Sequence, residues 1–144
     1  EAGFWDVAKL TCRPLVATHS NVHVLSPSAR NLTNRQLVAI AESAGVVGLN
    51  FHVGFLNTRC DETADVSLDQ MIRHLDHLIG ILGEDGVALG SDFDGCVLPT
   101  ELGNASGLPK LISAMRSSGF GEILINKICR ENWLDVMERC SVGR

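Results

Sequence analysis

Three short apolar runs divide the chain, and each is bounded by polar or turn-forming residues. They occupy residues 15–18, 46–51 and 87–91. Runs of this length without alternating polar positions are typical of the buried strands of a parallel sheet. We therefore predict three strands at these positions.

Segments with helical periodicity follow each strand. Thr33 with Gln36, and Ser67 with Gln70, have the spacing of a capping box, in which each residue's side chain bonds the other's backbone N–H. Further helices are expected over residues 1–10 and 123–137, and residues 53–66 are expected to form a long loop. Helix ends or starts are predicted at Gly45, Gly83 and Pro109.

The order of strand and helix, repeated along the chain, predicts parallel strands joined by right-handed crossovers. Three strands are too few to close a barrel, and no strand precedes the helix at residues 1–10. We therefore predict an α/β fold that forms the C-terminal portion, about three βα units, of a (β/α)8 TIM barrel, which takes about 250 residues when complete. Residues 1–144 are then a single partial domain, and the N-terminal strands lie outside the sequence.

Composition narrows the class of protein. Of the 144 residues, 45% are hydrophobic and 20% are charged, and the net charge of -5 without a basic cluster argues against a nucleic-acid partner. No apolar stretch approaches the ~20 residues that span a bilayer. The five cysteines lack C-x-x-C spacing, which favours reduced thiols in a cytosolic protein.

Two of the strands end in residues that bind metals. His19 follows the first strand and Asp92 follows the third, at the strand ends where α/β enzymes place their active sites. The structural alternatives are a hydrogen-bonded histidine at a strand–loop junction and an aspartate in an Asx turn or helix cap. Equivalent positions in the βα units favour a shared metal site. Asp94 has the same parity, but we interpret it as bonding backbone N–H groups in the turn at Gly95.

Other polar residues have weaker assignments. Arg30, just before a helix, is placed to clamp a substrate carboxylate through two parallel N–H bonds, or to be a solvated charge at the helix start. His23 and His52 lie in or near the site loops, and we interpret them as supporting residues rather than ligands. We place His74 and His77 on the solvated face of their helix.

Metal ligands are scarce in this sequence. A catalytic zinc takes about three protein ligands plus an open position, and a dinuclear site takes more. Only His19 and Asp92 are convincing ligands here. Either the others lie on strands outside the sequence, or the site is vestigial.

Six stretches, in order and with matching spacing, resemble the membrane (renal) dipeptidase family. They are PLVATHSN at 14–21, ARNLTN at 29–34, GVVGLNF at 45–51, HLDH at 74–77, GSDFDG at 90–95 and the pair NW at 132–133. The match covers essentially the whole chain. Each stretch alone is weak, but GSDFDG together with the upstream His-Ser and Arg-Asn pairs is a specific signature.

The resemblance implies a (β/α)8 barrel of the amidohydrolase type with two zinc ions (Zn2+) at the carboxyl ends of its strands. It implies that His19 ligates one ion, that Asp92 ligates the other and acts in catalysis, and that Arg30 grips the C-terminal carboxylate of the substrate. Phe55 falls where relatives place an aromatic ring near the substrate. We also expect a homodimer in the intact protein and contacts with the remaining barrel segments. The family includes membrane-anchored extracellular members beside the cytosolic form expected here.

The sequence departs from the family pattern in two respects. The family's first-strand His-x-Asp pair, its bridging Glu and its first strand-end His belong to parts outside this sequence, and the last of these is expected just before Glu1. Where the family usually has Gly-x-Asn near the last helix, this chain has Arg130-Glu131-Asn132, a difference that concerns local packing rather than the metal site.

The function predicted on this basis is zinc-dependent hydrolysis of dipeptides, including those with a D-residue at the C-terminal position, by the intact protein. The 144 residues alone are expected to be inactive. The alternatives are a non-catalytic barrel piece that serves as an assembly or binding surface, and another amidohydrolase-like hydrolase of small amides. A shared site requires His19 and Asp92 at the same end of one sheet, with their liganding atoms within roughly 8 Å of each other.

Overall fold

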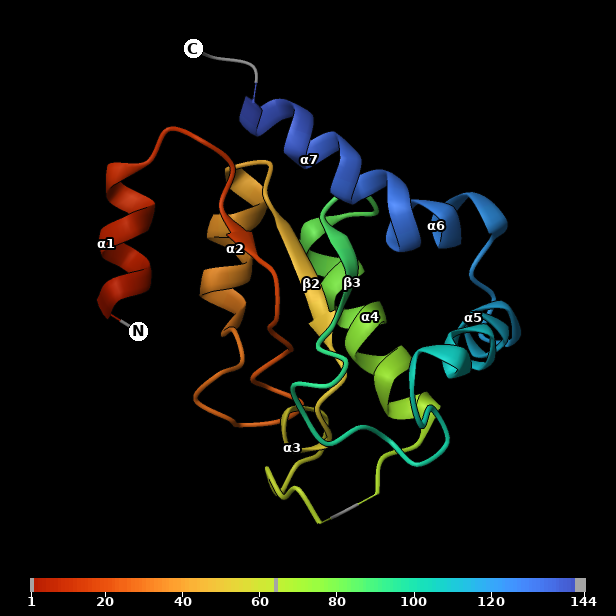
Figure 1. Ribbon diagram of the computed structural model, residues 1–144. Coiled ribbons are helices and arrows are strands. Elements are labelled where there is room, and N and C mark those ends of the chain that lie inside the picture. Colours follow the sequence, from red (N-terminus) through yellow and green to blue (C-terminus); the bar gives the residue numbers. More distant parts are fainter. Residues whose placement is uncertain (1, 64, 142–144) are drawn as a thin grey trace.

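The computed structural model describes residues 2–63 and 65–141 and has a parallel sheet at its centre (Figure 1). Its strands lie in the order β1-β2-β3, and both neighbouring pairs are parallel. They are β1 (Val16–Ala17), β2 (Val46–Asn50) and β3 (Val87–Ser91). The three predicted strands and their parallel arrangement are confirmed.

Helices precede, connect and follow the strands. They are α1 (Ala2–Leu10), α2 (Asn34–Glu42), α3 (Val53–Leu56), α4 (Leu68–Leu82), α5 (Leu108–Ser117), α6 (Glu122–Asn126) and α7 (Asn132–Ser141). A 3₁₀ turn, η1 (Ala105–Gly107), leads into α5, and a π-helical turn, η2 (Lys127–Glu131), joins α6 to α7. α3 lies where only a loop was predicted. Within the described ranges, no helix is long and apolar enough to cross a membrane.

Both predicted capping boxes are present. Gln36 Oε1 accepts a hydrogen bond from the Thr33 backbone N–H (2.9 Å), and Gln70 Oε1 accepts one from that of Ser67 (3.2 Å). The helix that starts at the second box ends at Gly83, as predicted, where φ is 74°. These local signals fix where α2 and α4 begin.

The end of α2 corrects one prediction. The helix ends at Glu42, and the left-handed conformation after it (φ 53°) belongs to Ala44 rather than to Gly45. A Cβ on Gly45 would lie 1.9 Å from the carbonyl oxygen of Leu15. Gly45 therefore allows the close approach of two backbone segments. Its N–H still closes the end of the helix by donating to the Ile40 carbonyl oxygen (2.9 Å), but the left-handed position is that of Ala44.

The main core lies between the sheet and the α2–α4 pair. Val47 and Leu49 of β2 are buried there with residues of both helices, among them Leu37, Ile40, Met71, Leu75 and Leu78. The alternate residues Val46 and Ala88 face the other side, where they pack against Val136 of α7. In Figure 1, α7 crosses the sheet near the ends at which the strands begin. The carboxyl ends lie at the opposite edge, beside α3.

The start of α7 is anchored to β3. The buried Asn132 donates from Nδ2 to the carbonyl oxygens of Glu84 and Val87, both at 2.7 Å, and Trp133 Nε1 donates to that of Leu89 (3.0 Å). Asn132 is the last residue of Arg130-Glu131-Asn132, which stands where the family usually has Gly-x-Asn. Despite this difference in sequence, the Asn132 amide holds the last helix against β3.

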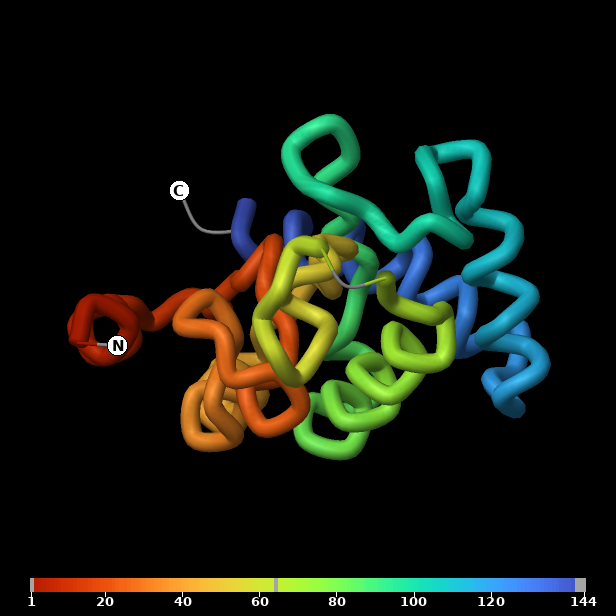
Figure 2. The backbone as a smooth tube through the Cα atoms, turned by 90° about the horizontal axis from the view of Figure 1, so that it is seen from below, coloured from red at the N-terminus to blue at the C-terminus, as the bar shows by residue number. Residues whose placement is uncertain are grey.

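Helix α1 packs more loosely than the others. None of its described residues is fully buried, and Leu10 is 88% exposed. It stands apart at the N-terminal end in Figure 2. Trp5 on α1 lies under the guanidinium of Arg35 on α2, with the Arg35 Cζ 4.6 Å from the ring centroid.

β3 contains one extra residue near its end. Leu49 pairs with Leu89 but Asn50 pairs with Ser91, so Gly90 forms a bulge. A Cβ on Gly90 would lie 2.1 Å from the Thr18 carbonyl oxygen and 2.7 Å from that of Gly48. The approach of the end of β1 to β3 therefore requires glycine at this position.

Replacing Gly90 by alanine should lower the free energy of unfolding by roughly 1–3 kcal/mol, because the new methyl group would overlap backbone atoms that have no room to move. The matched control is Gly80→Ala on the exposed side of α4, where a Cβ meets nothing within 4 Å. That change should raise stability by about 0.5–1 kcal/mol, since alanine favours the helix. Urea unfolding of the two variants measures both effects, and equal stability in the two would contradict the packing argument.

Candidate functional site

The segments that follow the three strands gather at the carboxyl edge of the sheet. Figure 2 looks toward this edge, and the segments after β1 (orange), β2 (yellow) and β3 (green) lie together there. His19 comes shortly after β1, and Asp92 directly follows β3. Because the strands are parallel, both residues lie at the same end of one sheet, as predicted. The separation of their liganding atoms stays a prediction.

A cleft of about 550 Å³ opens at this edge. Its walls contain Arg30, His52, Phe55, Glu62, Asp92, Asp94, Gly95, Cys96 and Val97. Three of the residues predicted for the site, Arg30, Phe55 and Asp92, thus line a single cleft although they follow or precede different elements. His19 is not part of this wall, as far as the described residues define it.

The carboxylate of Asp92 is held from the side of β2. Asn50 Nδ2 donates to Asp92 Oδ2 at 2.8 Å. Asp92 has a positive φ of 78°, a conformation that is costly outside glycine and that gathers at functional sites. The turn beyond it is closed by the Gly95 N–H, which donates to the main-chain oxygen of Asp92 (3.1 Å). The carboxylate of Asp94 does not make this bond, so that prediction is wrong.

His19 presents one ring nitrogen to its own neighbour. Its Nδ1 lies 2.7 Å from Thr18 Oγ1, a contact that leaves Nε2 for another partner. When Nδ1 carries the proton, Nε2 keeps the lone pair that a metal takes. An imidazole nitrogen and a carboxylate oxygen are both common zinc ligands, so the donor types fit a zinc site.

These two residues do not complete a metal centre. Among residues 2–63 and 65–141, no group of three or more His, Cys, Asp or Glu side chains is arranged to hold an ion. The assignment of His19 and Asp92 as metal ligands stays a prediction.

Arg30 and Phe55 lie next to each other in the cleft. The Arg30 Cζ is 6.0 Å from the Phe55 ring centroid, and the guanidinium is exposed. The ring of His52 also contacts Phe55, edge to face, with 4.5 Å between the ring centroids. His52 Nε2 in turn lies 3.2 Å from Glu62 Oε1. The geometry leaves Arg30 accessible to an anionic group beside an aromatic surface.

Three buried asparagines, to which no role was assigned from sequence, connect these parts. Asn21 Nδ2 donates to the carbonyl oxygens of Asn50 (2.9 Å) and Phe55 (3.3 Å), and Asn21 Oδ1 accepts from the Asn50 N–H (2.8 Å). Asn31, next to Arg30, donates from Nδ2 to the Phe55 oxygen (2.8 Å) and accepts from the Asn21 N–H (3.2 Å). Their positions in the sequence could have indicated a role in the site. Asn21 lies two residues after His19, Asn31 follows Arg30, and Asn50 ends a buried strand.

His74 corrects another prediction. It is not solvated on the helix surface but 1% exposed, and its Nδ1 accepts from the Val22 N–H at 3.2 Å while Nε2 lies 3.2 Å from the Leu56 carbonyl oxygen. Since a backbone N–H can only donate and a carbonyl can only accept, the ring is neutral with its proton on Nε2. It ties the loop after β1 to the end of α3. His77 is partly exposed and bonds Asn34 Oδ1, in line with its predicted place on the polar face.

Burial lowers the pKa of His74 from 6.5 to about 4, against the opposing effect of its bond to Leu56. The unfolded state therefore takes up a proton between those pH values that the folded state does not. The contribution of the neutral His74 ring to the free energy of unfolding is therefore complete above pH 6.5, falls on acidification below it, and is lower by roughly 3 kcal/mol near pH 4.

The stability difference between the unmodified protein and His74→Gln should therefore shrink on acidification, because glutamine does not titrate. Urea unfolding at a series of pH values between 7.5 and 4.5 measures this difference, with His77→Gln as the control. Parallel pH curves for the unmodified protein and His74→Gln would show that the buried histidine does not set this dependence.

The thiol of Cys96 also reaches the cleft. Burial, together with the nearby negative charge of Asp92, raises the pKa of Cys96 to about 11, and its Sγ donates to the main-chain oxygen of Asp92 (3.3 Å). A thiol with this pKa stays protonated at neutral pH. It is not an activated nucleophile.

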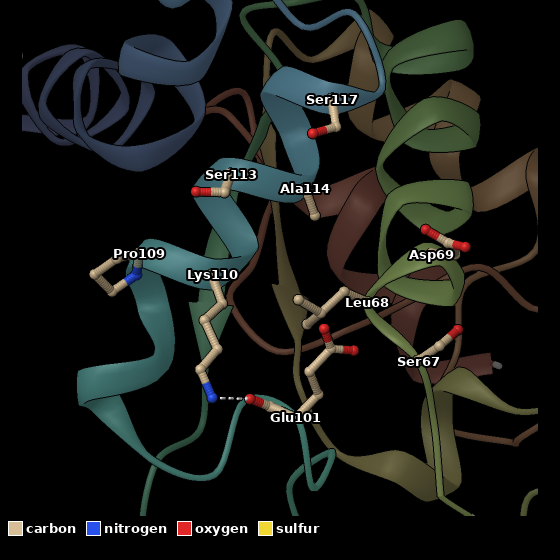
Figure 3. A pocket seen from close by; sticks show the side chains of 9 residues that line it. All are labelled: Ser67, Leu68, Asp69, Glu101, Pro109, Lys110, Ser113, Ala114 and Ser117. Carbon is tan, nitrogen blue, oxygen red and sulfur yellow. Dashed lines mark hydrogen bonds between the residues drawn. The ribbon is translucent and has the colours of Figure 1, made fainter.

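A second cavity, of about 570 Å³, lies in the helical layer and is drawn in Figure 3. It is bordered by the start of α4, by α5 and by the segment between β3 and η1. The ammonium group of Lys110 points across it and donates to the carbonyl oxygen of Glu101 (2.8 Å). No residue predicted for the site lines this cavity, so the cleft at the strand ends remains the candidate site.

Comparison with known proteins places these features in a family. The model of the membrane dipeptidase family (Peptidase family M19) matches residues 1–142. An uncharacterized protein in the pqqA 5' region of Klebsiella pneumoniae is 51% identical over 138 residues, which are 96% of this chain and 51% of that protein. An uncharacterized protein in the PQQ-III 3' region of Acinetobacter calcoaceticus is 49% identical over 79 residues, 55% of this chain and 25% of that protein.

Solved structures agree in fold. A metallopeptidase of family M19 described as dipeptidase AC, and a metallopeptidase from Rhodobacter sphaeroides liganded with a phosphinate mimic of the dipeptide L-Ala-D-Ala, are each 52% identical with a TM-score of 0.94. The match covers 96% of this chain but 41% and 40% of theirs. An amidohydrolase from Pseudomonas aeruginosa, 20% identical over 93% of this chain and 48% of its own, shares the fold with a TM-score of 0.81. The three βα units thus correspond to the C-terminal part of an amidohydrolase-like barrel, as predicted.

Proposed function

The chain belongs to the membrane dipeptidase family, peptidase family M19, and from this premise we propose that the whole protein hydrolyses dipeptides with the help of bound metal. The observation that carries the proposal is the cleft at the carboxyl edge of the sheet, where Arg30, Phe55 and Asp92 meet. It occurs in a chain 52% identical to a solved dipeptidase. The chain spans about half or less of the length of the matched relatives, so the proposal concerns the whole protein.

Arg30 and Phe55 would bind the C-terminal end of the substrate. The exposed guanidinium can form two parallel charge-assisted bonds with a carboxylate, and the neighbouring Phe55 ring offers an apolar surface to the side chain of the same residue. A carboxylate bound there must end the peptide. This arrangement therefore favours cleavage next to the C-terminal residue, and a dipeptide is the shortest peptide that meets this requirement.

His19 and Asp92 would hold metal at the same edge. We propose two zinc ions in the whole protein, one on His19 Nε2 and the other on Asp92, with the remaining ligands supplied by other parts of the protein. When bound, such ions supply Lewis acidity, which polarises the scissile carbonyl and lowers the pKa of a nucleophilic water. Asp92 also lies in the cleft wall, where its charge can interact with the free amine of the substrate.

The proposed substrates include dipeptides with a D-residue at the C-terminal position. The support comes from the Rhodobacter sphaeroides relative, which was solved with a mimic of L-Ala-D-Ala. A carboxylate clamp beside an open cleft places no demand for an L-configuration on the terminal residue. The substrate class is thus the dipeptide with a free C-terminus.

Arg30→Lys should raise KM for Gly-D-Ala about tenfold and leave the metal content unchanged, because lysine keeps the charge but loses the bidentate fork. Arg35→Lys is the matched control, since Arg35 stacks on Trp5 away from the cleft. Steady-state kinetics with Gly-D-Ala and with its C-terminal amide test the clamp. If the unmodified protein cleaves the amide as well as the free acid, Arg30 does not bind the carboxylate.

Removal of metal by a chelator should abolish hydrolysis of Gly-D-Ala, and added zinc should restore it. His19→Asn and Asp92→Asn should each lower the bound zinc by about one ion per chain, as measured by elemental analysis, because each removes one protein ligand from a different ion. His77→Asn, on the outer layer, should keep the full zinc content. Retention of all zinc by both site variants would refute the ligand assignment.

The alternative functions are separated by the same measurements. A whole protein that binds no zinc and cleaves no dipeptide would support a non-catalytic assembly surface. Zinc-dependent cleavage of small amides without a free carboxylate would support another amidohydrolase-like hydrolase. The cytosolic location, the homodimer and the contacts with remaining barrel segments stay predictions.

A further inference from the structure

Asn50 occupies the centre of the carboxyl edge. It is the last residue of β2, the strand between β1 and β3, and its side chain is 0% exposed. Its Nδ2 donates to Asp92 Oδ2 (2.8 Å), and its Oδ1 accepts from the His52 N–H (2.7 Å). A backbone N–H can only donate and an ionised carboxylate can only accept, so this pair of contacts fixes the orientation of the amide.

The backbone of Asn50 is held as firmly as its side chain. Asn21 bonds both its N–H (2.8 Å) and its carbonyl oxygen (2.9 Å). The same Asn21 amide reaches the carbonyl oxygen of Phe55. The donor that meets Asp92 is therefore part of a buried network that also holds the Phe55 side of the cleft.

The carboxylate that receives this bond is less constrained by its own surroundings. Asp92 is partly exposed, has a left-handed backbone and follows the bulge at Gly90. Asn50 restrains one carboxylate oxygen, Oδ2, and Oδ1 has no hydrogen-bond partner among the described residues. Removal of a buried donor that orients a metal-binding carboxylate in this way typically lowers metal affinity or activity about 10–100-fold.

We propose that Asn50 is a positioning residue that holds Asp92 Oδ2, so that the carboxylate keeps Oδ1 for metal and stays in register with the Phe55 side of the cleft. This inference rests on the proposed function. It assigns to Asn50 a role in metal retention and turnover beyond closing the end of a strand. Loss of its donor should act on Asp92, while the binding of the substrate carboxylate at Arg30 persists.

The test uses the whole protein and the variant Asn50→Asp, which keeps an acceptor for the His52 N–H but removes the donor to Asp92. Asn50→Ala removes the donor without adding a charge, and it carries the test if Asn50→Asp does not fold. The matched control is Asn132→Asp, because Asn132 is also buried (4% exposed) and its amide donates to two carbonyl oxygens at the other end of the sheet.

For the Asn50 variants we expect zinc affinity, measured by chelator competition, to fall roughly 10–100-fold, and kcat for Gly-D-Ala to fall at least about tenfold. KM should change by less than about threefold, because Arg30 is untouched. Asn132→Asp should lose a similar amount of thermal stability but keep zinc affinity and kcat.

Two results would overturn parts of this scheme, and they are distinguishable. If the unmodified protein retains zinc and cleaves Gly-D-Ala while the Asn50 variants match Asn132→Asp in zinc affinity and kcat, Asn50 is only structural and the proposed function stands. If the unmodified protein does neither, the proposed function fails, and the positioning role fails with it.

Discussion

The parallel pairing of β2 with both of its neighbours is the constraint on which the rest of the structure depends. Parallel strands bring all their carboxyl ends to one edge, so that segments many residues apart in the chain meet there. β2 is buried along its whole length and separates the segment that bears His19 from the segment that bears Asp92. Any loss of this pairing would scatter the residues of the cleft.

Strand pairing does not by itself orient the side chains at the carboxyl edge of the sheet. Buried asparagine amides orient them through hydrogen bonds. Asn21, Asn31 and Asn50 are each at most 5% exposed, and each meets backbone or carboxylate partners. Polar groups at this depth are costly unless they are bonded. In the described part of the chain, no buried side-chain nitrogen or oxygen lacks a partner. The edge is thus a satisfied polar network rather than a loose collection of loops.

The cleft combines this rigid base with exposed working groups. Arg30 and Glu62 are open to solvent, while His52 and the Asn50 amide behind them are buried. The buried, neutral ring of His74 ties the loop after β1 to the end of α3 through its bonds to Val22 and Leu56. Such a division between a packed support and accessible groups is what precise binding of a small substrate requires.

The sequence by itself determined the order of the three strands and where α2 and α4 begin, because the signals for them are local, whereas α3 was not predicted. Capping boxes at Thr33 and Ser67, the stop at Gly83 and three uninterrupted apolar runs depend on residues within a few positions of one another. Parallel pairing then follows from connectivity, and it places His19 and Asp92 at one edge. The position of Arg30 before a helix indicated a carboxylate clamp, the family resemblance added Phe55, and the structure brings both into one cleft with Asp92.

Tertiary structure decided what depends on contacts between distant segments. The burial of His74, the bond from Asn50 to Asp92 and the role of Gly45 against Leu15 each join residues some 30 to 50 positions apart, which no short-range periodicity records. A polar residue that flanks the apolar stripe of a helix, such as His74, gives the same sequence pattern whether its side chain faces water or a backbone partner. Only the packed chain settles which of the two it meets, because the loop or strand that supplies the partner comes from elsewhere in the sequence.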